Sequence, residues 1–170
     1  GDLALPGMLH AKIKRSTVAH ANIRRIDTSR ARALVGVEAV LTHENVPRVL
    51  HYGSPQPRAV SLARDQYILD RKVRYWGEGI AAVAAESEEV AEEALDLIEV
   101  EYEELRAAIT VEQALAPDAP MIHESRGNLV AAPVLVKRGD VERGFAQADL
   151  IVEGTFELGR PTPAYMEPNV

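Results

Sequence analysis

The stretch that decides the fold is residues 80–105, which read IAAVAAESEEVAEEALDLIEVEYEEL. Its first six residues, Ile80 to Ala85, form a short apolar run that predicts a buried strand. Ser87 is a good helix N-cap, and the two glutamates after it suit the positive end of a helix. From residue 99 onward glutamates alternate with Val100 and Tyr102, as in a half-buried strand. A strand, a helix and a second strand in this order indicate an α+β fold.

The helix is predicted over residues 87–98 and has two chemically different sides. The apolar side chains on one side are Val90, Ala91, Ala94, Leu95, Leu97 and Ile98. The carboxylates that lie largely on the other side are Glu88, Glu89, Glu92, Glu93 and Asp96. This separation is typical of a helix that packs one face on a core. We therefore expect Val90, Ala94, Leu95 and Ile98 to pack inward and Glu92 to face solvent.

Shorter elements precede this stretch. We predict strands at 8–14, 22–27, 37–41 and 73–76. A short helix is expected to begin at Asp27 or Thr28 and to run to Ala33, with Gly36 ending it because a left-handed C-terminal position favours glycine. The strand at 73–76 is predicted to join the strand at 80–85 through a tight turn at Gly77-Glu78-Gly79.

Residues 43–66 are predicted to form a long surface loop, because Pro47, Gly53, Pro55 and Pro57 interrupt any regular pattern. Long irregular loops in compact domains are often functional or interfacial. We expect this loop to be mobile in the isolated chain and ordered in a larger assembly. The alternative is that Val60, Leu62 and Tyr67 pin the loop to its own domain.

The C-terminal third contains weaker signals. The run Thr110-Val111-Glu112-Gln113 fits a helix capping box. Farther along, a strand is predicted at 134–137, a helix at 141–148 with Asp140 as its cap, and a final strand at 150–157.

The composition limits the functional classes. The chain has 170 residues, of which 46% are hydrophobic and 26% charged, as in ordinary globular domains. A net charge of −7 disfavours binding to nucleic acid, whose phosphates repel such a surface. The sequence has no cysteine, so it offers no disulfide, zinc thiolate or iron–sulfur ligand. It also contains no apolar run long enough for a membrane helix. It begins at Gly1 rather than Met, which we interpret as processing or as a fragment.

The residues taken alone nominate no catalytic, cofactor-binding or metal site. The five histidines are His10, His20, His43, His51 and His123. None of them lies three or four residues from another, so scattered structural roles are favoured over metal binding. The acidic run 99–104 lacks a calcium-loop pattern, and Gly77-Glu78-Gly79 lacks the rest of a nucleotide-binding loop. No Gly-x-Ser-x-Gly nucleophile motif occurs.

A family resemblance extends the interpretation. Its first part consists of Met8 to Lys12, Arg15-Ser16, His20-Ala21, Ile26-Asp27, Ala31, Gly36-Val37 and Leu41-Thr42. Its second part consists of residues 73–86 and 91–105, Asn128, Gly139-Asp140, Ala148-Asp149 and Met166-Glu167-Pro168. In this order they resemble the α/β-hammerhead domain that begins the molybdopterin-binding subunit of xanthine dehydrogenases, aldehyde oxidoreductases, carbon monoxide dehydrogenases and 4-hydroxybenzoyl-CoA reductases. The chain departs from the family pattern at Gly79-Ile80, Arg106 and Pro161-Thr162-Pro163.

The resemblance implies an α+β hammerhead fold with mixed sheets and a few short helices. It implies a hammerhead domain over residues 1–125, followed over 126–170 by a connecting segment and the start of the molybdopterin-binding region. The parent complex would oxidise or hydroxylate an aldehyde, purine, N-heterocycle or aryl-CoA substrate with water, in the cytoplasm. Molybdopterin, 2Fe–2S clusters and FAD would belong to that complex and not to this chain, whose catalytic glutamate would lie downstream.

By the same resemblance, the partners would be the remaining molybdopterin-binding domains and the iron–sulfur and FAD subunits or domains, with no nucleic acid and no membrane span. This chain would itself be inactive and would pack as a wedge against the iron–sulfur part. The alternative is a freestanding protein-interaction module without redox activity.

Overall fold

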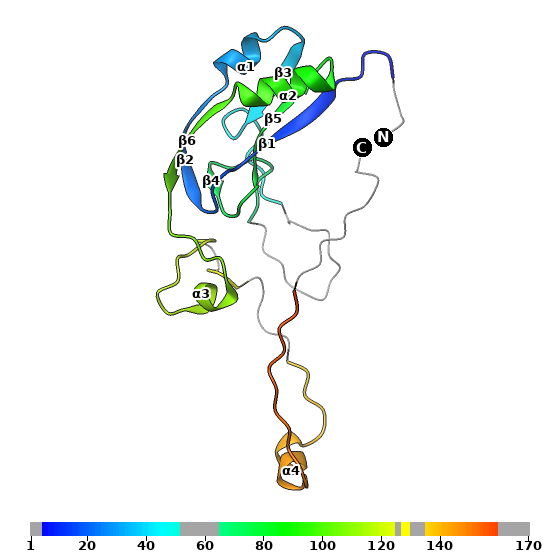
Figure 1. Cartoon of the computed structure of the whole chain (residues 1–170), viewed down its shortest axis with the longest axis vertical. Coiled ribbons are helices and arrows are strands. Elements are labelled where there is room, and N and C mark those ends of the chain that lie inside the picture. The colour runs from blue at the N-terminus through cyan, green and yellow to red at the C-terminus, as the bar shows by residue number, and fades with distance from the viewer. Residues whose placement is uncertain (1–4, 52–64, 125–126, 130–134, 160–170) are drawn as a thin grey trace. The chain divides into compact units, whose positions relative to one another are not determined.

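The computed structural model describes residues 5–51, 65–124, 127–129 and 135–159 (Figure 1). The chain divides into two compact units, one of residues 5–132 and one that includes residues 133–170. The first unit contains two three-stranded sheets and all of the helices but the last. The mixed α+β architecture predicted from the sequence is therefore confirmed.

The first sheet has the strand order β1-β5-β3 and is antiparallel. The strands are β1 (His10–Arg15), β3 (Val37–Thr42) and the central β5 (Gly79–Ala85). The apolar run of β5 suits a strand that has a neighbour on both sides. Val83 pairs with Lys12 on one side and with Val40 on the other, which sets the register of the sheet.

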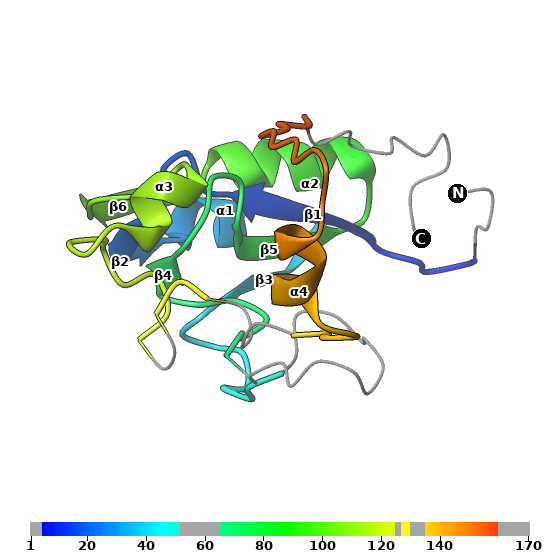
Figure 2. The same cartoon turned by 90° about the horizontal axis from the view of Figure 1, so that it is seen from below.

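One face of this sheet is covered by α1 (Ser29–Ala33) and α2 (Glu88–Asp96), with α2 lying along the sheet in Figure 2. The contact uses small side chains, because Ala91 and Ala94 are fully buried against a core that includes Val40 and Val83. Ser87 caps α2 by accepting a hydrogen bond from the backbone of Val90, as its sequence predicts. The inward face of the helix is confirmed, although Val90 and Leu95 are only partly buried.

The second sheet has the order β4-β2-β6, built from β2 (Ala21–Asp27), β4 (Lys72–Val73) and β6 (Glu99–Glu104). Ile23, Ile26 and Val73 bury their side chains in the core. Ion pairs join the outward side chains of β2, α1 and β6 in the order Arg24–Glu103, Arg25–Glu101 and Arg30–Glu99. Since charged side chains on an edge strand discourage pairing with other chains, β6 is a protected edge.

Two short helices follow. In α3 (Val111–Leu115) the capping box is confirmed, because the Thr110 hydroxyl accepts from the backbone of Gln113 and the Gln113 side chain accepts from the backbone of Thr110. In the second unit, α4 (Val141–Ala146) begins at Asp140, whose carboxylate accepts a hydrogen bond from the backbone of Arg143. The predicted cap is right, and the helix ends two residues earlier than expected.

Three strand predictions are wrong in whole or in part. Only Lys72 and Val73 of the stretch around 73–76 are extended, and they pair with β2 instead of forming a hairpin with β5. The turn itself is confirmed, since Gly77 adopts a φ of 83° that favours glycine. Residues 135–137 and 150–157 are not strands, because no neighbouring strand pairs with them within the described part of the chain.

The predicted loop 43–66 is irregular in its described parts, which hold a turn after β3 and one bridge between His51 and Gln66. Residues 52–64 lie outside the described residues, as do Pro161-Thr162-Pro163 and Met166-Glu167-Pro168. No helix in the described residues is long and apolar enough to span a membrane.

Candidate functional site: a polar junction around Asp70

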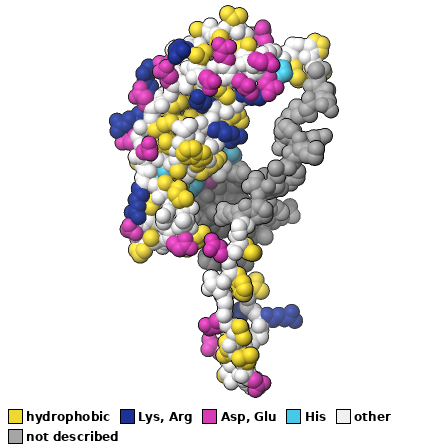
Figure 3. Space-filling view, viewed as in Figure 1, with side chains coloured by type: hydrophobic (Ala, Val, Ile, Leu, Met, Phe, Trp, Pro, Cys, Tyr) yellow, Lys and Arg dark blue, Asp and Glu magenta, His cyan; other side chains and the backbone are white. Residues whose placement is uncertain are grey.

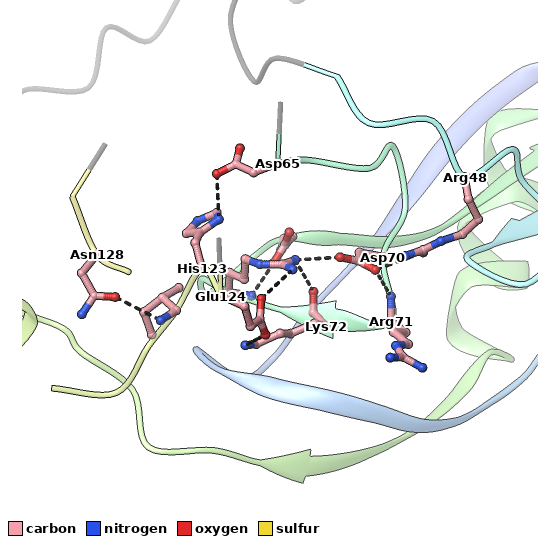
Figure 4. A network of polar contacts seen from close by, with 11 residues as sticks. Arg48, Asp65, Asp70, Arg71, Lys72, His123, Glu124 and Asn128 are labelled. Carbon is pink, nitrogen blue, oxygen red and sulfur yellow. Dashed lines mark hydrogen bonds and ion pairs between the residues drawn. The ribbon is translucent and has the colours of Figure 1, made fainter. Parts of the chain in front are cut away.

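A cluster of charged side chains lies where β4 meets residues 122–124 (Figure 4). We call it the Asp70 junction, and its members are Arg48, Asp70, Lys72, Arg74 and Glu124. At its centre, Arg74 Nη1 lies 2.7 Å from Asp70 Oδ2 and Arg48 Nη1 lies 3.0 Å from Asp70 Oδ1. The Asp70 side chain is only 6% exposed and the Arg74 side chain 13%. Both charges of this central pair are therefore largely removed from water.

The two guanidinium groups decide the charge state of Asp70. Burial by itself raises the pKa of a carboxyl group, but hydrogen bonds from Arg74 and Arg48 outweigh it and hold the pKa of Asp70 below its ordinary value. The backbone N–H of Arg71 also donates to Asp70 Oδ1 at 2.8 Å. Arg48 lies in addition over the ring of Tyr67, 3.7 Å from the ring centroid, which orients its guanidinium. Asp70 is thus an ionised structural anchor with every oxygen in use.

The junction reaches across the sequence to Glu124. Lys72 Nζ contacts Glu124 Oε1, and Arg74 Nη2 lies 3.9 Å from Glu124 Oε2. The hydrogen bond from Lys72 is the main reason why the pKa of Glu124 is lowered. Since Lys72 and Glu124 are 52 residues apart, these contacts tie a strand of the second sheet to a distant segment.

Asn128 fixes that segment from its other end. Its side-chain oxygen accepts a hydrogen bond from the backbone of Ile122 at 3.0 Å, and its amide nitrogen donates to the carbonyl oxygens of Ala114 and Pro120. His123 Nδ1 lies 3.0 Å from Asp65 Oδ2. Asn128 therefore satisfies the backbone of a turn and links it to α3, which explains physically why an asparagine occupies this position.

Glu78 completes the surroundings of Arg74. The backbone N–H of Arg74 donates to Glu78 Oε2 at 2.5 Å, which closes the turn between β4 and β5. Burial raises the pKa of Glu78, and the hydrogen bond from Arg74 offsets this only in part. Arg74 Nε is buried without a hydrogen-bond partner among the described residues. Arg74 thus carries much of the cost of burying charge in this region.

A cavity of about 220 Å³ adjoins the junction, lined by Arg74, Ala114, Ile122, His123 and Asn128 among others. The cationic groups beside it are already engaged with Asp70 and Glu124. In the described ranges, no group of three or more His, Asp or Glu side chains could hold a metal ion. The junction is therefore suited to holding two chain segments together, and the chemistry of a nucleophile or a metal is not evident in its groups.

The histidines singled out from the sequence lie apart from one another. His10 is in β1 and His20 precedes β2, where its Nδ1 lies 2.7 Å from the carbonyl oxygen of Arg106. His43 is in the turn after β3, and His51 bridges to Gln66. His123 borders the junction, and His43 lies close enough for the charges of Arg48 and Asp70 to act on its pKa, which burial lowers. None of the junction residues was predicted from the sequence as part of a site. The available signal was an aspartate and basic residues interrupting the apolar stretch 67–76.

Two family descriptions match the chain in succession. Residues 1–106 match the a/b hammerhead domain of aldehyde oxidase and xanthine dehydrogenase. Residues 122–170 match the molybdopterin cofactor-binding domain. Glu124 and Asn128 thus fall within the second match, whereas Asp70 and Arg74 fall within the first.

Individual proteins show the same likeness. The chain is 45% identical over 166 residues to a probable xanthine dehydrogenase subunit of Bacillus subtilis (strain 168), covering 98% of this chain and 21% of that protein. It is 39% identical over 168 residues to the nicotinate dehydrogenase large molybdopterin subunit of Eubacterium barkeri, covering 99% of this chain and 38% of that protein. The chain thus spans less than half the length of either relative.

A solved structure agrees with these relatives. The aldehyde oxidoreductase of Desulfovibrio gigas superimposes with a TM-score of 0.74 at 35% identity, over 86% of this chain and 16% of that one. The match of residues 1–106 covers more than half of the 170 residues. The resemblance predicted from the sequence is confirmed: this chain belongs to the aldehyde oxidase and xanthine dehydrogenase family of molybdopterin oxidoreductases, with matches to the hammerhead domain and to the cofactor-binding domain.

Proposed function

We propose that the chain is a structural part of a molybdenum oxidoreductase large subunit and that it positions the start of the cofactor-binding domain. The observation that carries this proposal is the Asp70 junction. Lys72 and Arg74, inside the hammerhead match, hold Glu124, inside the cofactor-binding match. The central Asp70–Arg74 pair is buried and costs stability when one partner is lost. It thereby holds Arg74 in place beside Glu124, whose own side chain is 66% exposed.

The parent complex is proposed to oxidise or hydroxylate an aldehyde, purine, N-heterocycle or aryl-CoA substrate with water as the oxygen source. When bound, the molybdenum cofactor supplies the two-electron oxidation. Among the described residues, the charged groups of the Asp70 junction are engaged with one another, and none of them is assigned to that cofactor. We assign this chain no catalytic residue and no step of the reaction.

The second unit supports the proposal that the rest of the cofactor-binding domain is required. Its described residues expose most of their large apolar side chains, for example Leu135 at 86%, Val152 at 82% and Phe156 at 91%. Isolated stretches of this kind cannot bury their apolar surface and need a partner to cover it. The remaining molybdopterin-binding domains are the natural partner, because the family match extends through these residues.

We place the hammerhead domain at residues 1–125 and the connecting segment with the start of the cofactor-binding region at 126–170. Glu124 lies at this boundary, because the second match begins at residue 122. The matches to 1–106 and 122–170 support a boundary in this region. The proposed partners also include iron–sulfur and FAD subunits or domains, and a cytoplasmic location is part of the proposal. These last points rest on the family resemblance.

The proposal can be tested in the parent large subunit with the variant Arg74→Met. This substitution keeps a long side chain but removes the charge that pairs with Asp70 and Glu124. We expect less molybdenum per purified subunit and easier proteolytic cleavage between residues 115 and 132. The matched control is Arg30→Met, which removes an arginine paired on the exposed surface with Glu99. Equal molybdenum content and equal cleavage in both variants would contradict a positioning role.

A further inference from the structure

The first sheet has a second face, which no described helix covers. Register places two cross-strand rows on it, Ile13–Ala82–Leu41 and Ala11–Ala84–Ala39. Residues paired across neighbouring strands share a face, so these side chains point away from the face that α2 covers. The covered face carries Lys12, Val83 and Val40 in the corresponding row. Every residue of the two rows on the open face is apolar.

The shape of this open face follows from residue size. Ala82 on the central strand is flanked by the larger Ile13 on β1 and Leu41 on β3, whereas Ala84 is flanked by Ala11 and Ala39. Ile13 is 51% exposed and Leu41 is 42% exposed. A Cβ on Gly79 would approach Ile13 Cγ2 at 3.2 Å, so the glycine at this position leaves room for Ile13. The departure at Gly79 from the family pattern thus leaves space for an apolar side chain on the open face.

The opposite side of this layer has the chemistry of a surface that faces water. Figure 3 shows Asp and Glu side chains gathered over α2, with Lys and Arg along the edge formed by β2 and β6. The Lys12 ammonium group contacts Glu88 and lies 3.0 Å from Glu92 Oε1 on that side. A sheet with a helix and charges on one side and two rows of apolar side chains on the other is typical of a layer that packs against a further layer.

We propose that this open sheet face is a docking surface. Its occupant is an apolar face of the cofactor-binding domains that form the rest of the parent large subunit. The inference rests on the proposed function. Its occupant follows from length: the chain covers 16% of the aldehyde oxidoreductase chain on which it superimposes and 21% of the Bacillus subtilis relative, so most of such a protein lies elsewhere. A second copy is disfavoured, because each copy carries a net charge of −7.

Single cysteines provide the test, since the chain has none of its own. Ile13→Cys and Leu41→Cys place a thiol on the open face, and Val35→Cys, at a position 89% exposed in the turn before β3, is the matched control. Each variant is labelled with iodoacetamide in the isolated chain and in the full-length large subunit, and the labelled peptide is quantified by mass spectrometry. Ala11→Cys, at an exposed position on the same face, replaces either variant that does not fold by circular dichroism.

Burial of the face predicts that labelling at positions 13 and 41 slows by roughly tenfold or more in the full-length subunit, while position 35 is labelled equally fast in both. Equal rates at position 41 in both proteins would overturn the docking surface without affecting the proposed function. Protection in the isolated chain that grows with protein concentration would overturn it in favour of a second copy. A native polypeptide no longer than this chain would contradict the proposed function, and the docking surface, which rests on it, would be contradicted as well.

Discussion

The guanidinium of Arg74 lies 2.7 Å from the carboxylate of Asp70, and this pair anchors the contact between β4 and Glu124. Asp70→Asn removes the negative charge and leaves Arg74 buried without its main counter-charge. We expect a loss of about 3 kcal/mol in the free energy of unfolding, because breaking a buried pair leaves an uncompensated charge. Urea denaturation measures this loss. Asp118→Asn is the control, since the Arg106–Asp118 pair is exposed and should change little; equal losses would show that Asp70 is no anchor.

The pH dependence of stability should carry opposite contributions from Asp70 and Glu78. The pKa of Asp70 is below its ordinary 3.8 in the folded state, so its stabilisation is present above that value and is lost as pH falls through the folded pKa. Burial raises the pKa of Glu78 above its ordinary 4.5, so its contribution is present below that value and is lost as pH rises through the folded pKa. The free energy of unfolding of Glu78→Gln, relative to that of the parent sequence, should therefore be higher at neutral pH than in acid.

Urea melts of Glu78→Gln and of the parent sequence between about pH 3 and about pH 7 test this difference. The glutamine retains an acceptor for the backbone of Arg74 but cannot ionise. A stability difference that does not vary with pH would mean that Glu78 is already solvated and that its pKa is not raised.

The tight contact between α2 and the first sheet predicts a penalty for added volume. Ala94 is fully buried, so Ala94→Leu should cost about 1–3 kcal/mol by overpacking. Glu93→Leu introduces the same side chain at the neighbouring exposed position and should have little effect. Thermal or urea unfolding of both variants measures the difference. Similar losses at both positions would show that the inward face of α2 is assigned wrongly.

The isolated chain of 170 residues is expected to bind no molybdenum, iron or flavin. The reason is chemical: the sequence has no cysteine to ligate iron and no complete loop motif to cradle the phosphate of a cofactor. Elemental analysis and an absorption spectrum of the purified chain test the expectation. Stoichiometric molybdenum in that preparation would contradict it.

Local signals were sufficient for α2 and β6, since a serine cap, separated acidic and apolar faces and strict alternation lie within residues 87–104. They were insufficient for β4, which pairs with β2 and not with β5, the next strand along the chain. The apolar composition of 150–157 predicted a strand, but composition alone cannot supply a neighbouring strand to pair with it. Pairing across the chain is a tertiary property, and strand propensity reports mainly how a side chain fits a half-buried surface.

The Asp70 junction was missed for a related reason. Its contacts join Arg48 to Asp70 across 22 residues and Lys72 to Glu124 across 52. Charged residues at such separations resemble an ordinary solvated surface until the fold brings them together and buries them. Asn128 was noticed only through the family resemblance, although its three hydrogen bonds give it a clear structural role.

The central claim is that this chain is part of a larger molybdopterin-containing subunit. The most direct measurement is the intact mass and molybdenum content of the native polypeptide that carries this sequence, purified from its source under mild conditions. The account predicts a polypeptide several times heavier than 18.6 kDa that retains molybdenum. A native polypeptide of about 18.6 kDa, without molybdenum and without a tightly bound partner that contains it, would contradict the account.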